Sequence, residues 1–159
     1  MNHLIVYASK HGTVKKAADI LRFQLKGSCE LHNILEEESV YLSDVDTVII
    51  GASVYFGSIH KKLKQFLENY EEVLLQKRVA IFICAGEENP ESLQKEIEDN
   101  FPLSFRNHAH PIEVIGYEIH FNQLNFIEKF IIKNVKNIQE DKEKLCEFAI
   151  FQFARALNM

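Results

Sequence analysis

Residues 4–18, LIVYASKHGTVKKAA, decide the fold, because an apolar strand runs into a polar turn with one glycine and then directly into a helix. The N–H groups of such a turn and of the first helical turn point toward one place, where the partial positive charge of the helix end favours a phosphate. Hydroxyls at Ser9 and Thr13 add further donors. The stretch therefore predicts a strand-turn-helix unit with an anion site at its turn.

The turn does not match the two common nucleotide motifs. The Walker motif needs a second glycine followed by Lys and Ser or Thr, and the dinucleotide motif needs three glycines, whereas this turn has only Gly12. A triphosphate with magnesium is therefore not expected. An ordinary strand-to-helix connection without a ligand is the competing interpretation of the turn taken alone.

The composition is typical of one soluble globular domain. The 159 residues fit a single domain over residues 1–159, with 47% hydrophobic and 26% charged residues. A net charge of -5 argues against general nucleic-acid binding, which needs a basic surface. The widely spaced Cys29, Cys84 and Cys146 favour a reducing, cytoplasmic compartment. The sequence enters a strand at once, so neither a signal peptide nor a membrane span is expected.

Strand and helix patterns alternate along the chain. Strands are expected at 4–7, 29–34, 47–52, 79–84 and 110–119, and helices at 14–26, about 59–70, 90–97, 124–138 and 141–157. Five strands that alternate with helices indicate a parallel sheet covered on both faces. Ligands bind such sheets at the carboxyl ends of the strands, so the loops 9–14, 53–60 and 85–89 are expected to converge there.

The loop after the third strand, GASVYFGSIH at 51–60, places Tyr55 and Phe56 side by side before Gly57. Exposed aromatic rings lose solvation free energy unless they cover a flat ligand, and the isoalloxazine ring of a flavin is flat with apolar faces. Glycine lets backbone N–H groups approach the edge of such a ring. One of the two aromatic rings is expected to fold back into the core and the other to stack on the ligand.

Together these features resemble the flavodoxin family. The spacing Ser9-x-x-Gly12-x-x is similar to the phosphate loop of flavodoxins, and residues 48–60 are similar to a loop of the flavodoxin-like protoporphyrinogen dehydrogenases of bacteria. The run FIEKFIIK at 126–133 also resembles that family. The resemblance implies an α/β three-layer sandwich with a five-stranded parallel sheet of order 2-1-3-4-5. It further implies FMN and electron exchange; in the family's defined members the donor is protoporphyrinogen IX and the acceptor a membrane quinone.

The resemblance implies that FMN binds at three loops, with its phosphate at the first loop and its ring at the other two. The implied cofactor-binding residues are Ser9, Lys10, His11, Gly12, Thr13, Val14, Ser53, Val54, Tyr55, Phe56, Gly57, Ala85, Gly86 and Glu87. The flavin itself carries the redox chemistry, so neither a catalytic side chain nor a metal ligand is expected.

Two departures from the family pattern bear on affinity and substrate. Val14 stands where the phosphate loop usually has its last hydroxyl, and a lost hydrogen bond to a charged group costs about 1.5–3 kcal/mol, or roughly ten- to a hundredfold in affinity. The segment 85–105 is acidic and shorter than the long basic insertion of the protoporphyrinogen dehydrogenases. An acidic rim repels porphyrin propionates and favours basic partner proteins. Glu87 or Glu88 near the reduced ring is expected to lower its potential.

Four other reactive side chains are expected to be structural. His60 falls early in an amphipathic helix, where it is expected to be solvated rather than to donate protons. Cys84 ends a buried strand and is expected to act as a small hydrophobe. His108 and His110 lack partners at a metal-binding spacing.

The segment 124–138 has two interpretations. Leu124, Ile127, Ile131, Val135 and Ile138 form one helical stripe, which is expected to pack on the sheet. The lysines lie on another face, and two phenylalanines lie off the stripe. These features suit a helix that lies on an anionic membrane surface or near a quinone. In this second interpretation the protein contacts the inner face of the membrane peripherally.

Three functions remain open. The first is an FMN oxidoreductase related to protoporphyrinogen dehydrogenase or acting on another small substrate, with a porphyrinogen or quinone as partner. The second is an electron-carrier flavodoxin that serves a redox partner protein and has no substrate of its own. The third is a flavodoxin-fold binding module without flavin, which Val14 favours.

Overall fold

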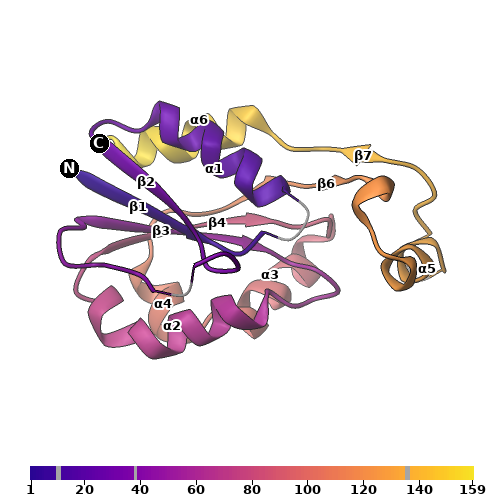
Figure 1. Ribbon diagram of the computed structural model, residues 1–159, viewed down its shortest axis with the longest axis horizontal. Helices are drawn as coiled ribbons and strands as arrows, with labels where there is room; N and C mark the ends of the chain where they lie inside the picture. Colours follow the sequence, from indigo (N-terminus) through magenta and orange to yellow (C-terminus); the bar gives the residue numbers. More distant parts are fainter. Residues whose placement is uncertain (10–11, 38, 135–136) are drawn as a thin grey trace.

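A five-stranded parallel sheet forms the centre of the molecule in the computed structural model, which describes residues 1–9, 12–37, 39–134 and 137–159 (Figure 1). The strands are β1 (Asn2–Tyr7), β2 (Ser28–Asn33), β3 (Thr47–Ser53), β4 (Arg78–Cys84) and β5 (Ile112–Gly116). Their order is β2-β1-β3-β4-β5, and every pairing in this sheet is parallel. The predicted sheet order is confirmed.

Helices cover both faces of this sheet (Figure 1). One face carries α2 (Lys61–Leu74), α3 (Pro90–Asn100) and the short α4 (Leu103–His108), and the other carries α1 (Thr13–Gln24) and α6 (Glu147–Leu157). Successive side chains of a strand point to opposite faces, and in β1 the two faces belong to different clusters. Leu4 and Val6 pack in the cluster with α2, while Ile5 and Tyr7 pack in the cluster with α1 and α6. The short helix α4 was not expected.

The close packing of α1 on the sheet depends on Gly51 in β3. A Cβ at Gly51 would lie 2.5 Å from Cζ of Phe82 and 3.0 Å from Cγ1 of Val14. Both neighbours are buried, so neither side chain has free space to move into. Gly51 therefore sets the distance between α1 and β3 directly below the first loop.

Two polar side chains at the amino-terminal edge of the sheet donate hydrogen bonds to backbone carbonyls. The buried His3 donates from Nε2 to the carbonyl oxygen of Lys26 at 3.0 Å. Burial disfavours the imidazolium and holds the pKa of His3 below its ordinary value. The guanidinium of Arg78 donates to the carbonyl oxygens of Leu157 at 2.9 Å and Ala156 at 3.0 Å, which fixes the end of α6 to the sheet.

The predicted strand at 110–119 divides into two. Gly116, the last residue of β5, has φ +95°, and a Cβ there would collide with the carbonyl oxygen of Lys144. The chain turns away from the sheet at this point. The next strand, β6 (Glu118–Ile119), pairs antiparallel with β7 (Lys142–Glu143) in a separate two-stranded sheet. A single continuous strand was therefore the wrong expectation.

Residues 117–146, here called the insert, leave and rejoin the domain between β5 and α6. Besides β6 and β7 the insert holds a 3-10 turn, η1 (Phe121–Gln123), and α5 (Phe126–Asn134). Its two ends lie together, because Cys146 N donates to Ile115 O at 2.8 Å and Lys144 N donates to Tyr117 O at 2.8 Å. The insert extends past the carboxyl ends of the strands (Figure 1). The long insertion thus follows β5, whereas in the protoporphyrinogen dehydrogenases the insertion was expected after the fourth strand.

The helices expected at 124–138 and 141–157 are shorter than predicted, and α5 buries a different side from the one that was expected. It lies beyond the strand ends and not on the sheet (Figure 1). Its inward side carries the buried Glu128 and Ile132, while Ile127 is 67% exposed; the buried Leu124 precedes the helix. The expected stripe is therefore wrong at Ile127, and Val135 lies outside the described residues. None of the helices in the described part of the chain is long and apolar enough to cross a membrane.

Candidate functional site

The first loop ends at Gly12, which begins α1 in the left-handed conformation with φ +86°. Gly12 N donates to Ser9 Oγ at 3.0 Å. Within the described residues no side chain caps α1 and its first turn holds no acidic residue, so the N–H groups of that turn are available to an anion. A Cβ at Gly12 would meet nothing within 4 Å, so the space above it is open. The predicted Lys10 and His11 lie outside the described residues.

The second loop is a tight hairpin that presents two aromatic rings. Tyr55 N donates to Ser58 O at 2.9 Å, and between them Phe56 and Gly57 have φ of +52° and +75°. Two successive left-handed residues make the kind of turn that matches a twisted hairpin, although a non-glycine residue there is strained. The rings of Tyr55 and Phe56 meet edge to face at 4.5 Å. Neither ring belongs to the buried core, contrary to the expectation for one of them.

The environment of Tyr55 keeps its hydroxyl protonated. Burial, with the nearby charge of Glu128 adding to it, raises the pKa of Tyr55 to about 12. Phe56, by contrast, is 41% exposed at the tip of the hairpin. The two rings therefore occupy different surroundings, one against the insert and one toward solvent.

Asn100, at the end of α3, holds this hairpin in place, and sequence reasoning did not find it. Its Oδ1 accepts from Ile59 N at 2.9 Å, and its Nδ2 donates to the carbonyl oxygens of Gly57 at 2.9 Å and Glu96 at 2.7 Å. The side chain is buried. No local sequence signal marks this role, because the contacts join residues about forty positions apart.

The third loop runs past the insert. Ala85 is buried beneath it, and the space beside Gly86 is closed by the ring of Tyr117, which a Cβ at Gly86 would meet at 3.5 Å. Glu87 lines the smaller of two cavities described below. Glu87 and Glu88 were both expected to lie near the flavin ring, and of the two only Glu87 lines the smaller cavity.

Glu88 turns instead to the insert. Its carboxylate pairs with the ammonium of Lys144, and this hydrogen bond together with the charge of Lys144 holds the pKa of Glu88 below its usual range. The negative charge of Glu88 is thus balanced by a lysine of the insert. This pair also ties the third loop to the second half of the insert.

Two adjacent cavities lie where the three loops meet the insert. The smaller measures about 90 Å³ and is lined by Thr13, Ser53, Val54, Tyr55, Phe56, Gly57, Cys84, Gly86, Glu87, Glu96, Tyr117, Glu118, Ile119, Ile132 and Ile138. The larger measures about 390 Å³ and is lined by Ala8, Ser9, Thr13, Val14, Ser53, Tyr55, Ser58, Ile59, His60, Glu118 and Glu128. Most of the described residues predicted for the three loops therefore line one or both cavities, although Gly12 and Ala85 line neither. The insert adds a wall that the sequence did not indicate.

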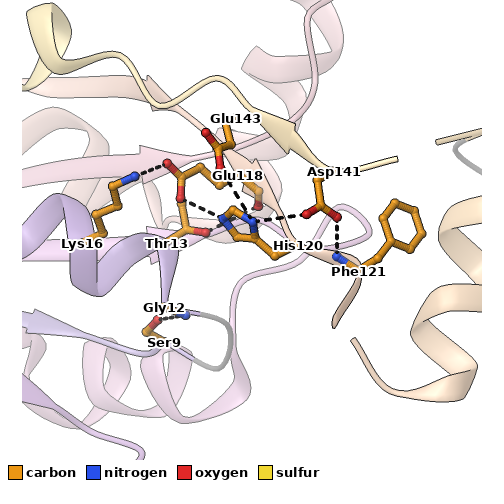
Figure 2. A network of polar contacts seen from close by, with 9 residues as sticks. All are labelled: Ser9, Gly12, Thr13, Lys16, Glu118, His120, Phe121, Asp141 and Glu143. Atoms are coloured by element: carbon orange, nitrogen blue, oxygen red, sulfur yellow. Dashed lines mark hydrogen bonds and ion pairs between the residues drawn. The ribbon is translucent and has the colours of Figure 1, made fainter. Parts of the chain in front are cut away.

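Glu118 of the insert lies at both cavities and binds the start of α1 (Figure 2). Its carboxylate accepts from Lys16 Nζ at 2.6 Å and from His120 Nε2 at 3.2 Å, and Thr13 Oγ1 donates to its carbonyl oxygen at 3.4 Å. Burial alone would raise the pKa of Glu118, but the hydrogen bonds and charges of Lys16 and His120 outweigh it and lower the pKa. Sequence reasoning missed this residue because it placed Glu118 within a strand.

The surroundings of Val14, His60 and Cys84 define the roles of their side chains. Val14 is buried against Gly51 and also borders the larger cavity. His60 is exposed and precedes α2, where its Nδ1 accepts from Lys62 N at 3.1 Å. Burial raises the pKa of the Cys84 thiol to about 12, so this thiol stays protonated and unreactive. In the described part of the chain no group of His, Cys, Asp and Glu side chains could hold a metal ion.

Comparisons with known proteins agree with this architecture. A family model described as a flavodoxin domain matches residues 4–145. No curated protein matches the sequence. Among solved structures, flavodoxin 2 from Bacillus cereus is similar at TM-score 0.61 and 18% identity, covering 98% of this chain and 97% of that one. An NAD(P)H:quinone oxidoreductase from Methanothermobacter marburgensis is similar at TM-score 0.61 and 10% identity, covering 100% and 96%. An FMN-bound flavodoxin mutant from Fusobacterium nucleatum is similar at TM-score 0.51 and 18% identity, covering 70% and 67%.

Proposed function

The chain belongs to the flavodoxin domain family, and from this premise we propose that it binds FMN, with the phosphate at the first turn of α1 and the ring between the loops 53–58 and 85–89. The uncapped first turn of α1 and the open space at Gly12 support the phosphate position. The similar flavodoxin from Fusobacterium nucleatum is described as bound to flavin mononucleotide. FMN, when bound, supplies the redox chemistry.

The side chains around the proposed site orient the ligand and exclude water. Ser9 and Thr13 offer hydroxyls beside the N–H groups of α1 at the larger cavity. Tyr55 and Phe56 offer aromatic surface for a flat ring, and Asn100 fixes their hairpin. The carboxylate of Glu87 borders the smaller cavity, where its charge opposes the gain of further negative charge.

We propose further that the protein is an oxidoreductase with a substrate of its own, of the protoporphyrinogen dehydrogenase kind with an acceptor of the quinone class. One observation carries this proposal: the insert closes the ring loops with an apolar wall made by Tyr117, Ile119, Ile132 and Ile138. An apolar wall of this kind suits the face of a flat ring, while Glu87, Glu96 and Glu118 line the same cavity. A carrier that only passes electrons to a partner protein gains nothing from such a wall.

The first experiment measures FMN binding and turnover separately. FMN is titrated into the purified protein and its fluorescence followed, and then oxidation of protoporphyrinogen is assayed with a soluble quinone. The two variants Ile132→Ala and Ile127→Ala form a matched pair on α5, because Ile132 lines the smaller cavity and Ile127 is exposed on the other side.

Ile132→Ala is expected to lower kcat/KM for the quinone about tenfold, since truncating a buried apolar contact removes roughly 1–3 kcal/mol of binding, while Ile127→Ala stays at the wild-type value. Absence of FMN binding would contradict both proposals, and the flavin-free binding module would then be the remaining function. Equal effects of the two variants would contradict the role given to the insert.

An electron carrier without its own substrate is the second candidate. The exposure of Phe56 at the rim favours it, as does the acidic character of residues 87–99, since carriers dock partners through complementary charge. This candidate predicts that bound FMN is reduced only through a protein reductase. Direct reduction by protoporphyrinogen, without any other protein, would contradict it.

We also propose peripheral membrane contact through the outer face of α5. Phe126 and Phe130 are 86% and 62% exposed there, and the exposed Lys133 lies on the same helix. Aromatic side chains beside lysines suit the interface of an anionic membrane. Co-sedimentation with vesicles that contain anionic lipid is expected to fall in Phe126→Ser and Phe130→Ser. The control Phe148→Ser, equally exposed on α6, keeps wild-type binding; loss there as well would contradict the assignment.

A further inference from the structure

A line of titratable side chains runs from the surface of the insert to the wall of both cavities (Figure 2). Glu118 forms the inner end, with a side chain that is only 6% exposed. His120 Nε2 lies 3.2 Å from its Oε2. On the other side of the ring, His120 Nδ1 lies 3.8 Å from Asp141 Oδ2 and 4.0 Å from Glu143 Oε1. Both of these outer carboxylates are exposed to water.

A purely structural role explains this arrangement poorly. A carboxylate loses several kcal/mol of hydration when it is buried, and an apolar side chain of similar size closes the same wall at lower cost. The outer ion pairs are solvent-exposed and contribute little stability. Lys16, which approaches Glu118 from α1, offsets part of the cost of burial. What the arrangement does provide is a connection between water and the cavity through groups that exchange protons.

We propose that Glu118 and His120 form a proton relay, which carries protons from water at Asp141 and Glu143 into the cavity while an acceptor there is reduced. This inference rests on the proposed oxidoreductase function. It gives the insert a second task beside forming a wall. It also separates the two redox candidates, because a carrier that passes single electrons to another protein has no need for protons in its cavity.

The reaction sets the number of protons that the relay must deliver. An acceptor of the quinone class gains two electrons and two protons as its two carbonyl oxygens become hydroxyls. Protoporphyrinogen is the reductant that the proposed function names, and the reduced cofactor would supply both electrons and one proton. The relay therefore delivers the second proton. Water at Asp141 and Glu143 protonates His120 at Nδ1, the Nε2–H bond of His120 breaks as Glu118 is protonated, and the O–H bond of Glu118 breaks as one forms on the acceptor. His120 then carries its proton on Nδ1, and a turn of its ring returns that proton to the side of Glu118 before the next turnover.

Lys16 sets the resting state of the pair. Burial alone would raise the pKa of Glu118, yet the hydrogen bonds and charges of Lys16 and His120 hold that pKa below its usual range. Glu118 is therefore ionised at rest, and because its lowered pKa makes it a weak base, it holds the proton only briefly before passing it to the acceptor. The charged groups that face His120 come from each neighbouring element: Glu118 on β6, Asp141 before β7 and Glu143 on β7.

The test follows proton uptake directly. FMN-loaded, reduced protein is mixed with a soluble quinone in weak buffer, and a pH-indicator dye reports the protons consumed. Glu118→Gln and His120→Ala, each saturated with FMN, are expected to slow this uptake about a hundredfold, the usual contribution of a positioned proton donor. Added imidazole is expected to restore the rate in His120→Ala. The control His108→Ala, whose Nε2 lies 2.7 Å from the carbonyl oxygen of Lys77, keeps the wild-type rate.

A second measurement uses the protein without FMN and needs no turnover. Nuclear magnetic resonance titration of the Glu118 carboxyl is expected to show a pKa below its usual range, and this pKa is expected to rise in His120→Ala because the hydrogen bond and charge of His120 are lost. If wild-type protein binds FMN and reduces quinone, but both variants take up protons at the wild-type rate, the relay is refuted. Failure of imidazole to restore His120→Ala refutes it as well. If wild-type protein reduces no quinone, the proposed function fails first.

Discussion

Replacing Val14 with Thr tests where an anion sits on the first loop. In the structure Val14 Cγ1 faces Gly51 and the same residue borders the larger cavity. In the isosteric rotamer the methyl group of Thr takes the place of Cγ1, so the packing against Gly51 is kept. The new hydroxyl takes the place of the other methyl group and is expected to reach the cavity.

The substitution has separate effects on FMN affinity and on the stability of the protein without FMN. A hydrogen bond to a charged phosphate contributes about 1.5–3 kcal/mol, so FMN is expected to bind Val14→Thr roughly ten- to a hundredfold more tightly. Without ligand the hydroxyl is held in a buried position, which costs about 1–3 kcal/mol if it has no partner. The free protein should therefore be less stable while the complex is tighter.

Fluorescence titration with FMN and urea unfolding without FMN measure the two effects. Val14→Ala serves as the control, because it loses packing without gaining a donor and is expected to lose stability with no gain in affinity. The reasoning is wrong if Val14→Thr is folded but binds FMN no better than the wild type. In that case the phosphate does not lie over the first turn of α1.

Three further changes test the fold around the site. Gly51→Ala is expected to lower the free energy of unfolding by about 1–3 kcal/mol in urea titrations through overpacking against Phe82, and the loss should shrink in the double variant with Phe82→Leu. Asn100→Ala removes the partner of the buried N–H of Ile59 and one partner of the Gly57 carbonyl, so we expect a loss of about 1–3 kcal/mol in urea titrations and weaker FMN binding. The pKa of His3 in the folded chain lies below 6.5, so the unfolded chain takes up a proton first as the pH falls. The free energy of unfolding should therefore decline below about pH 6.5 in the wild type and stay level in His3→Gln.

The sheet was predictable because its signal is local. The strands β1, β3 and β4 are continuous apolar runs that are buried on both faces, and parallel strands of this kind stand out in any sequence. The first loop was predictable for a similar reason, since Gly12 and the start of α1 are neighbours in the chain.

The insert was harder to predict because its contacts are distant in sequence. Glu118 meets Lys16 across 102 positions, and Lys144 meets Glu88 across 56. The pattern of α5 was misleading because the helix packs against loops at the strand ends, where it buries Glu128 and Ile132 and exposes Ile127. Hydrophobic periodicity identifies a helix, but it does not identify the surface against which the helix packs.

The adjacent ends of the insert have an evolutionary consequence. Because residues 115 and 146 are joined by a backbone hydrogen bond, the insert is a cassette that enters and leaves the domain at one point. Exchanging it for a shorter or longer segment is expected to keep the strand order, because loop length itself has a small entropic cost, while the contacts of Glu118 with Thr13 and Lys16 of α1 would change with it. A lineage of such proteins can therefore acquire new substrates by replacing this cassette while the cofactor-binding sheet is inherited unchanged.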